Sequence, residues 1–363
     1  MPKLPVVSCA TPAGVARRDV LRGILAITVL NIPIVGCGST KSGAAASPYE
    51  PDGRPIQDLP ADSRVPILWV EAGVCTGCSC SLLDSDSFET ATLPLLRLEF
   101  AETLMEQFGS DAIDHILATA QTSKGQYILV VDGAVPVDTS AGAYSALTTT
   151  GQDSSGTNYT VFAMISALAA NAKQVVAIGA CASFGGIPGS NPNTGIEVSL
   201  ADAIAAAGIT LPSQLIRVPG CPPNPVWAVD TFTTLLTTGF GPSDLDYLGR
   251  PLKHFGDTVH DNTCPRRPSF DASLFTTVPG DMTPVGPNGE PPCLLNAGCK
   301  GVNTFADCPK QPWQGKSWCI QAGAPCIGCA APGFLDGRTS TGGITVGGTE
   351  PTATSPFYVK PAS

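Results

Sequence analysis

The chain has 363 residues, of which 14 % are charged, and its formal net charge is −10. This length is enough for two domains, and the acidic balance argues against a nucleic-acid-binding protein, which would need a basic face. The 14 cysteines are many for such a chain, so we expect disulfides, metal ligands or both.

The N-terminus has the pattern of an export signal. Arg17 and Arg18 precede an apolar run that is too short for a comfortable membrane span, which is typical of a twin-arginine signal, although Val20 stands where phenylalanine is usual. The run ends in IVGC, which resembles a lipoprotein cleavage box. Lipidation at Cys37 is one hypothesis, and ordinary cleavage nearby or an uncleaved anchor are the alternatives. We assign residues 1–36 to the signal and expect a periplasmic protein, or one on the outer face of the cytoplasmic membrane.

Residues 37–63 are small, polar and rich in proline, and we expect a linker there. Four apolar, β-rich runs follow (PILWV, YILVVDGAVP, QVVAIG and LIRVPG), and segments with helical periodicity lie between them, near residues 160–172 and 199–207 among others. Strands that alternate with helices and have nearly continuous apolar cores indicate a parallel α/β sheet. We assign residues 64–236 to this domain.

Cys75, Cys181 and Cys221 each come a few residues after a predicted strand. In open parallel sheets, ligands bind beyond the carboxyl ends of the strands. Cysteines far apart in the sequence can therefore converge on one site at this edge.

The composition changes near residue 237, where proline, glycine, cysteine and tryptophan become frequent and periodicity becomes weak. The segment lacks the pattern for a large apolar core, so we expect metal clusters to stabilise it. We assign residues 237–335 to this loop-rich domain, and residues 336–363, rich in glycine and threonine, to an extended arm.

Three uses of the cysteines remain open from the residues alone. Exported cysteines usually form disulfides, but twin-arginine substrates are commonly exported folded, and the C-x-x-C pairs are too close for ordinary bridges. Structural zinc would suit two such pairs, but the partners of the first pair lie more than a hundred residues away. Prolines beside cysteines, as in GCPP and TCPRR, are common around iron–sulfur clusters.

Eight motifs occur in one order: VEAGVCTGCSCSLL, VVDGAVP, AIGACASFGG, VPGCPPNP, HDNTCPRRPSFD, CLLNAGCKG, ADCPK and SWCIQAGAPCIGC. Together they resemble the small, electron-transferring subunit of nickel–iron hydrogenases, over about residues 65–356. A shorter resemblance, to a cluster subunit of respiratory complex I, covers the α/β domain only. The family resemblance implies a flavodoxin-like sheet domain followed by a mostly irregular and α-helical cluster domain.

The resemblance implies three sets of cluster ligands, which we name by their distance from the nickel–iron site. The proximal set is Cys75, Cys78, Cys181 and Cys221. The distal set is His260, Cys264, Cys293 and Cys299. The medial set is Cys308, Cys319, Cys326 and Cys329.

Two positions depart from the usual family pattern. Three residues separate His260 from Cys264 where two are usual; a small bulge could absorb the extra one, and His254 is the competing ligand. Cys319 stands where most members have proline, as in the nickel–iron–selenium branch, which CTGCS and the terminal SPFY also resemble. A fourth thiolate there would make the medial cluster 4Fe–4S, so we expect three 4Fe–4S clusters.

The remaining residues that could bind metal are left without a cluster. Cys9 lies in the signal, and His115 is expected to be a packing or surface residue. Cys80 is either a small buried residue at the start of a helix or a redox-active thiol beside the proximal set.

The implied function is electron transfer within a heterodimeric hydrogenase, an oxidoreductase acting on hydrogen. The large subunit would hold nickel and iron, so we expect no catalytic residue in this chain. Electrons would pass from the proximal set to His260, whose neutral imidazole should raise the potential of the outermost cluster. The expected acceptor is a multihaem c-type cytochrome, with a quinone route through a separate membrane protein as the alternative. The alternative function is an iron–sulfur subunit of an oxidoreductase that does not act on H2.

Overall fold

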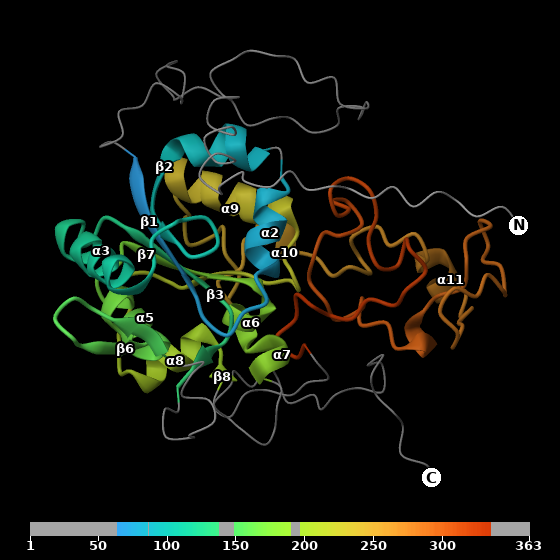
Figure 1. The fold of residues 1–363 in the computed structure, drawn as a ribbon. Coiled ribbons are helices and arrows are strands. Elements are labelled where there is room, and N and C mark those ends of the chain that lie inside the picture. The colour runs from blue at the N-terminus through green and yellow to red at the C-terminus, as the bar shows by residue number, and fades with distance from the viewer. Residues whose placement is uncertain (1–63, 86, 138–148, 190–196, 335–363) are drawn as a thin grey trace, which may run out of the picture. The chain divides into compact units, whose positions relative to one another are not determined.

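The computed structural model describes residues 64–85, 87–137, 149–189 and 197–334 (Figure 1). All of them belong to one unit, Ala46–Ser363. The predicted signal with Arg17, Arg18 and Cys37 therefore lies outside the described residues, as do the predicted linker and arm. Within the described part, no helix is both long enough and apolar enough to cross a membrane.

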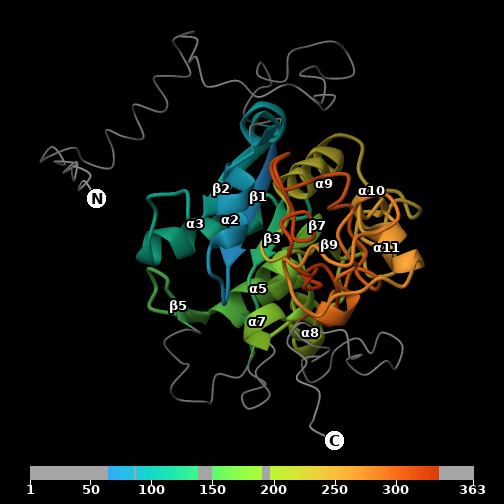
Figure 2. The same cartoon turned by 90° about the vertical axis from the view of Figure 1, so that its right-hand side faces the viewer.

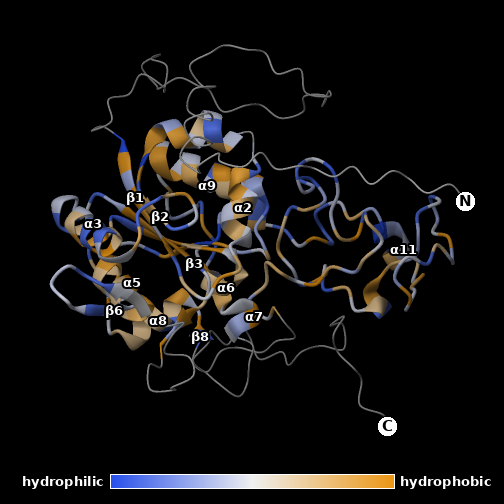
Figure 3. Ribbon diagram, viewed as in Figure 1, coloured by the Kyte–Doolittle hydropathy of each residue, from blue (hydrophilic) through white to orange (hydrophobic). Residues whose placement is uncertain are grey.

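Five parallel strands form the central sheet, in the spatial order β2-β1-β3-β7-β9. Their bounds are Val65–Glu71 (β1), Leu96–Ala101 (β2), Ile128–Asp132 (β3), Gln174–Ile178 (β7) and Ile216–Val218 (β9). Along the chain this is the strand order 2-1-3-4-5 of flavodoxin-like folds, so the predicted α/β class is confirmed. The strands are apolar along most of their length, as Figure 3 shows, because helices or the C-terminal segment cover both faces.

Alternate residues of the strands point to opposite faces of the sheet. Leu68 and Val70 pack on one face with helices α3 (Gly109–Thr122), α5 (Val161–Ala169) and α8 (Leu200–Ala206). Ile67 and Trp69 pack on the other face with α2 (Gly77–Leu83) and α9 (Pro225–Thr237). Side-chain caps fix the starts of α5, α8 and α9, as expected for Thr160, Ser199 and Asn224 at N-cap positions.

Smaller elements complete the sheet region (Figure 2). Two short antiparallel pairs join β4 (Val135–Pro136) to β8 (Glu197–Val198) and β5 (Thr149–Gln152) to β6 (Asn158–Thr160). The short helical turns are η3 (Phe88–Thr92), η4 (Leu93–Leu95), α6 (Gly179–Phe184) and α7 (Gly186–Gly189).

The described C-terminal segment, residues 238–334, contains only α10 (Leu252–Phe255), α11 (Arg267–Asp271) and η6 (Leu295–Ala297) as regular elements. Most of its buried apolar residues, among them Val259 and Ile320, belong to the same core cluster as Trp227 and Phe232 of α9. This segment therefore packs its apolar side chains on the sheet domain instead of enclosing a separate core.

Candidate functional site

The proximal set lies at the carboxyl edge of the parallel sheet. Cys75 follows β1, Cys181 lies in α6 directly after β7, and Cys221 follows β9. Cys78 lies in the first turn of α2 and is buried. The structure thus brings Cys75, Cys181 and Cys221 to one edge, as the positions of the predicted strands required.

These four thiols are close enough for their charges to interact. Burial raises the pKa of Cys78, and the charges of Asp132, Cys181 and Cys75 raise it further. Burial also raises the pKa of Cys181 to about 12, with an added contribution from Cys221. Buried thiols stay protonated when their thiolate forms would repel one another, unless a cation binds them as thiolates. The donor set therefore fits the positively charged iron core of a cluster.

Two glycines leave room for the proximal thiols. Gly179 has a φ of 82°, and a Cβ at this position would lie 2.5 Å from Cys78 Sγ. Gly186 has a φ of 52°, and a Cβ there would lie 2.8 Å from Cys181 Sγ. Larger residues would meet both a backbone penalty and a thiol, so these glycines keep the edge open.

The distal set lines a small cavity together with Arg266. Burial raises the pKa of Cys264 to about 11, while the backbone N–H of Arg266 donates to this thiol and opposes the rise. The N–H groups of Gly301 and Cys326 donate in the same way to Cys299, the second at 3.4 Å. Backbone donors aimed at sulfur stabilise thiolates, as expected around a cluster.

The two candidate histidines have different surroundings. His260 lines the cavity of the distal set and packs edge-on against Phe270, with ring centroids 4.4 Å apart. His254 is buried, and its two ring nitrogens lie at hydrogen-bond distance from two carboxylates. The structure therefore places His260, and not the competing His254, beside the three distal cysteines. The three residues between His260 and Cys264 lie in a turn, in which Thr263 has a φ of 68°.

The medial set is brought together from the last described loops. Burial raises the pKa of Cys308 well above its ordinary value, and the charges of Cys329, Cys326, Asp307 and Cys319 add to the rise. The residue Cys319 is exposed overall, but its thiol lies close enough to influence the other three. Four thiols thus share this site.

Direct contacts connect the three sets in series. The backbone N–H of Cys221, in the proximal set, donates to the thiol of Cys329, in the medial set. The backbone N–H of Cys326, in the medial set, donates to Cys299 Sγ in the distal set. The order along these contacts is proximal, medial, distal.

The other sulfur and histidine predictions have separate outcomes. All twelve cysteines in the described residues are free thiols. No three His, Cys, Asp or Glu side chains of the described residues are arranged to hold one metal ion, as a tetrahedral zinc site would require. Cys80 is exposed, so the expectation of a buried residue there is wrong, because α2 turns this position away from the core. His115 is a half-exposed partner of Glu99, at 3.2 Å, as expected for a surface residue.

Comparison with known proteins identifies the family. Residues 255–341 match the C-terminal family of the NiFe/NiFeSe hydrogenase small subunit, and residues 75–235 match the family described as NADH ubiquinone oxidoreductase, 20 Kd subunit. The periplasmic NiFeSe hydrogenase small subunit of Desulfomicrobium baculatum is 35 % identical over 309 residues, which cover 82 % of this chain and 87 % of the relative. The chain belongs to the family of NiFe hydrogenase small subunits.

Other members of this hydrogenase family agree over most of the chain. The periplasmic NiFe hydrogenase small subunit 1 of Nitratidesulfovibrio vulgaris is 33 % identical over 328 residues, covering 90 % of this chain and 92 % of the relative. The structure of the reduced, active Ni-Fe-Se hydrogenase from Desulfomicrobium baculatum superposes with a TM-score of 0.66 at 35 % identity, covering 75 % of this chain and 96 % of that chain. The fold and the predicted hydrogenase family are therefore confirmed.

As a hydrogenase small subunit, the chain is the iron–sulfur, electron-transferring part of an oxidoreductase that acts on hydrogen. It works in a heterodimer with a large subunit, which holds the nickel–iron site. It relays electrons between that site and an external acceptor. When bound, iron–sulfur clusters carry single electrons, and the three ligand sets described above are the residues that would hold them.

Several residues beside the hydrogenase ligands were not predicted. Asp132 lies at the end of β3 against Cys78, and burial raises its pKa to about 7. Arg266 is buried beside the distal cysteines, and Asp307 acts on Cys308. The sequence held two local signals for these residues. One is the DG dipeptide after a strand, and the other is a charged residue within two positions of a predicted ligand cysteine.

Proposed function

We propose that this small subunit holds three 4Fe–4S clusters, one on each ligand set, through which electrons pass between the large subunit and the external acceptor. Eleven cysteines and His260 supply four ligands for each cluster. The observation that supports the proposal is that the charge of Cys319 raises the pKa of Cys308, Cys326 and Cys329, because a fourth thiolate near these three would complete a 4Fe–4S site.

Electron paramagnetic resonance of the oxidised heterodimer tests the medial assignment. We expect no stoichiometric 3Fe–4S signal from the parent protein and a strong one from Cys319→Pro, which restores the residue usual in the family. A strong 3Fe–4S signal in the intact parent would contradict the proposal. Metal analysis of the same native complex should find nickel together with iron; its absence, with no hydrogen uptake, would count against the hydrogenase role.

We propose a periplasmic c-type cytochrome as the acceptor, received near His260. Three exposed carboxylates lie in this region, on Asp257, Asp261 and Asp271, whereas Arg267 and Lys310 are their ion-pair partners. These exposed carboxylates, on a chain with net charge −10, favour a basic partner. The quinone route remains the alternative, since the quinone-reactive Ni/Fe-hydrogenase small chain of Wolinella succinogenes is 33 % identical over 328 residues.

The rate of cytochrome reduction by H2 tests whether the cytochrome docks at this region. The second-order rate constant should fall as ionic strength rises, and should also fall in the double variant Asp261→Asn, Asp271→Asn. The matched control is Asp153→Asn, which removes an exposed carboxylate from the turn between β5 and β6. Equal rates in all three proteins would reject docking at this region.

We propose export by the twin-arginine route, with residues 64–236 and 237–335 as the two cluster-binding domains. The paired arginines and the periplasmic location of two relatives support export, and the family matches fall on either side of residue 236. Replacing Arg17 and Arg18 by lysine should retain the protein in the cytoplasm. Mass spectrometry of the mature N-terminus tests the lipid on Cys37: a start beyond that residue would exclude it.

A further inference from the structure

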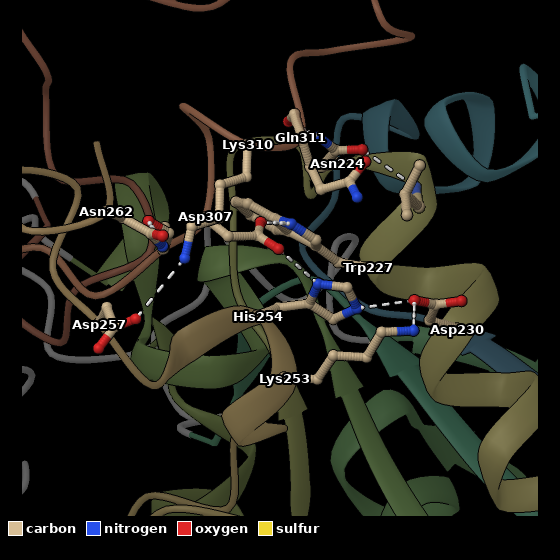
Figure 4. A network of polar contacts seen from close by, with 12 residues as sticks. Asn224, Trp227, Asp230, Lys253, His254, Asp257, Asn262, Asp307, Lys310 and Gln311 are labelled. Carbon is tan, nitrogen blue, oxygen red and sulfur yellow. Dashed lines mark hydrogen bonds and ion pairs between the residues drawn. The ribbon is translucent and has the colours of Figure 1, made fainter. Parts of the chain in front are cut away.

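His254 is buried between two aspartates. Its Nδ1 lies 2.8 Å from Asp307 Oδ2, and its Nε2 lies 3.1 Å from Asp230 Oδ2 (Figure 4). Ionised carboxylates only accept hydrogen bonds, so this arrangement suits a protonated ring, which can donate from both nitrogens at once. Burial lowers the pKa of His254, but hydrogen bonds and charges from Asp230 and Asp307 outweigh burial and raise the pKa above its usual value.

The inner end of this arrangement reaches the medial set. Asp307 directly precedes Cys308, and its charge acts on the Cys308 thiol. The Nε1–H of Trp227 donates to Asp307 Oδ1 at 2.5 Å, while His254 Nδ1 lies 2.8 Å from the other oxygen. These two contacts hold the Asp307 carboxylate in one orientation. The net charge of the His254–Asp307 pair therefore acts on the medial site.

The outer end reaches solvent. The side chain of Asp230, on α9, is 32 % exposed and also accepts a hydrogen bond from Lys253 of α10. Asp230, Lys253 and His254 line a surface cavity of about 330 Å³, to which Asp244 also contributes. Water in this cavity can exchange protons with His254 through the Asp230 carboxylate.

The charges that face His254 balance while the ring is protonated. The negative groups are Asp230 of α9 and Asp307, which precedes Cys308. Lys253 of α10 pairs with Asp230 on its solvent side and balances its charge. Arg250 lies on the ring of Phe255, which packs against His254. Loss of the His254 proton leaves one uncompensated negative charge beside the medial site, where an added electron is then less favourable.

We propose that His254 is a positioning residue of the electron relay that couples reduction of the medial site to protonation from solvent through Asp230. The inference rests on the medial cluster proposed above. In the coupled step the medial site gains one electron, which H2 oxidation supplies, and His254 gains one proton from water in the cavity; both leave again on oxidation. At low pH the ring is already protonated and reduction needs no proton. At higher pH reduction draws the proton in, so the potential of the medial site falls as pH rises.

Redox titration of the intact heterodimer at a series of pH values tests this coupling, with the medial signal in electron paramagnetic resonance assigned by its change in Cys319→Pro. In the parent, the medial midpoint potential should fall with pH and level out on both sides of the His254 titration. The steepest slope allowed for one proton per electron is tenfold in the equilibrium constant per pH unit, or about 59 mV. In His254→Gln the slope should disappear.

Two further variants make the result specific. Asp230→Asn keeps an oxygen acceptor for Nε2 but removes the outer charge, so the fall in potential should move to lower pH; it also serves if His254→Gln does not fold. His115→Gln, which removes another histidine–carboxylate pair on α3, should leave the curve unchanged. A medial midpoint independent of pH in the parent, or an unshifted curve in Asp230→Asn, overturns the inference while leaving the clusters in place. A parent without a medial 4Fe–4S signal instead overturns the proposed function.

Discussion

Gly179→Ala should remove the proximal cluster while leaving the fold largely intact. Gly179 lies between β7 and Cys181, with a φ of 82°. The left-handed backbone conformation would destabilise the alanine variant by about 1–2 kcal/mol. Its Cβ would also lie 2.5 Å from Cys78 Sγ, whereas carbon contacts settle near 3.5–4.0 Å, so the thiol has to move by about 1 Å.

A displacement of about 1 Å is large for a metal ligand, because metal–ligand distances are fixed within roughly 0.2 Å. The displaced Cys78 is buried, and Asp132 and Cys181 close around it, so it has little room to return. We therefore expect the heterodimer to lose about one cluster's share of iron and sulfide. Hydrogen-dependent reduction of an external dye should fall at least tenfold, because the first carrier of the relay is missing.

The matched control is Gly208→Ala. Gly208 has a φ of 66°, and a Cβ there would meet nothing within 4 Å. It carries a similar backbone penalty of about 1–2 kcal/mol without a thiol to displace. Iron content, spectra of the reduced protein and the unfolding temperature are compared for both variants. A full proximal signal in Gly179→Ala, or equal cluster loss in both, would refute the reasoning.

Three further changes have defined outcomes. Arg266→Gln should lower the distal-cluster potential by tens of millivolts in a redox titration, because a buried positive charge beside three thiolates is lost; about 59 mV corresponds to a factor of ten for one electron. Asn224→Ala should cost about 2 kcal/mol in denaturant unfolding, since it removes both the cap of α9 and the hydrogen bond to the Gln311 carbonyl, whereas Ser199→Ala, a cap of α8, should cost about 1 kcal/mol. Removal of iron by chelation should increase amide exchange in residues 238–334 much more than in the sheet, because the described loops of that segment contain few regular elements and would depend on the proposed cluster ligands.

The parallel sheet could be predicted where burial on both faces leaves an unbroken apolar run. This holds for β1, β3, β7 and β9, and also places the three strand-end cysteines. The strand β2 was not predicted, because Arg97 and Glu99 interrupt its apolar pattern. These charges are tolerated because β2 is an edge strand. There Glu99 pairs with His115 of α3 instead of packing in the apolar core.

The proposed ligand sets follow from the family resemblance, which rests on motifs that are dense in cysteine, proline and glycine. The solvent exposure of an individual cysteine such as Cys80 could not be predicted from such motifs. Cys80 lies in a helix of small and polar residues, GCSCSLL, in which both faces look alike in the sequence. Only the packing of α2 on the sheet, which buries Cys78, Ser79 and Ser81, decides that Cys80 faces outward.

The polar network around His254 could not be predicted, because its members are spread over three parts of the chain. Asp230 precedes His254 by 24 residues and Asp307 follows it by 53, and no motif joins them. The ligands of a metal group recur as patterns because their spacing is dictated by the group, whereas a buried charge pair needs only to meet its partner once the chain is folded. The charged groups around the proposed medial site are therefore found only in the structure, whereas its proposed ligands follow from motifs in the sequence. In this small subunit the two meet at Asp307 and Cys308, where one peptide bond joins a carboxylate of the His254 network to a proposed ligand whose pKa it raises.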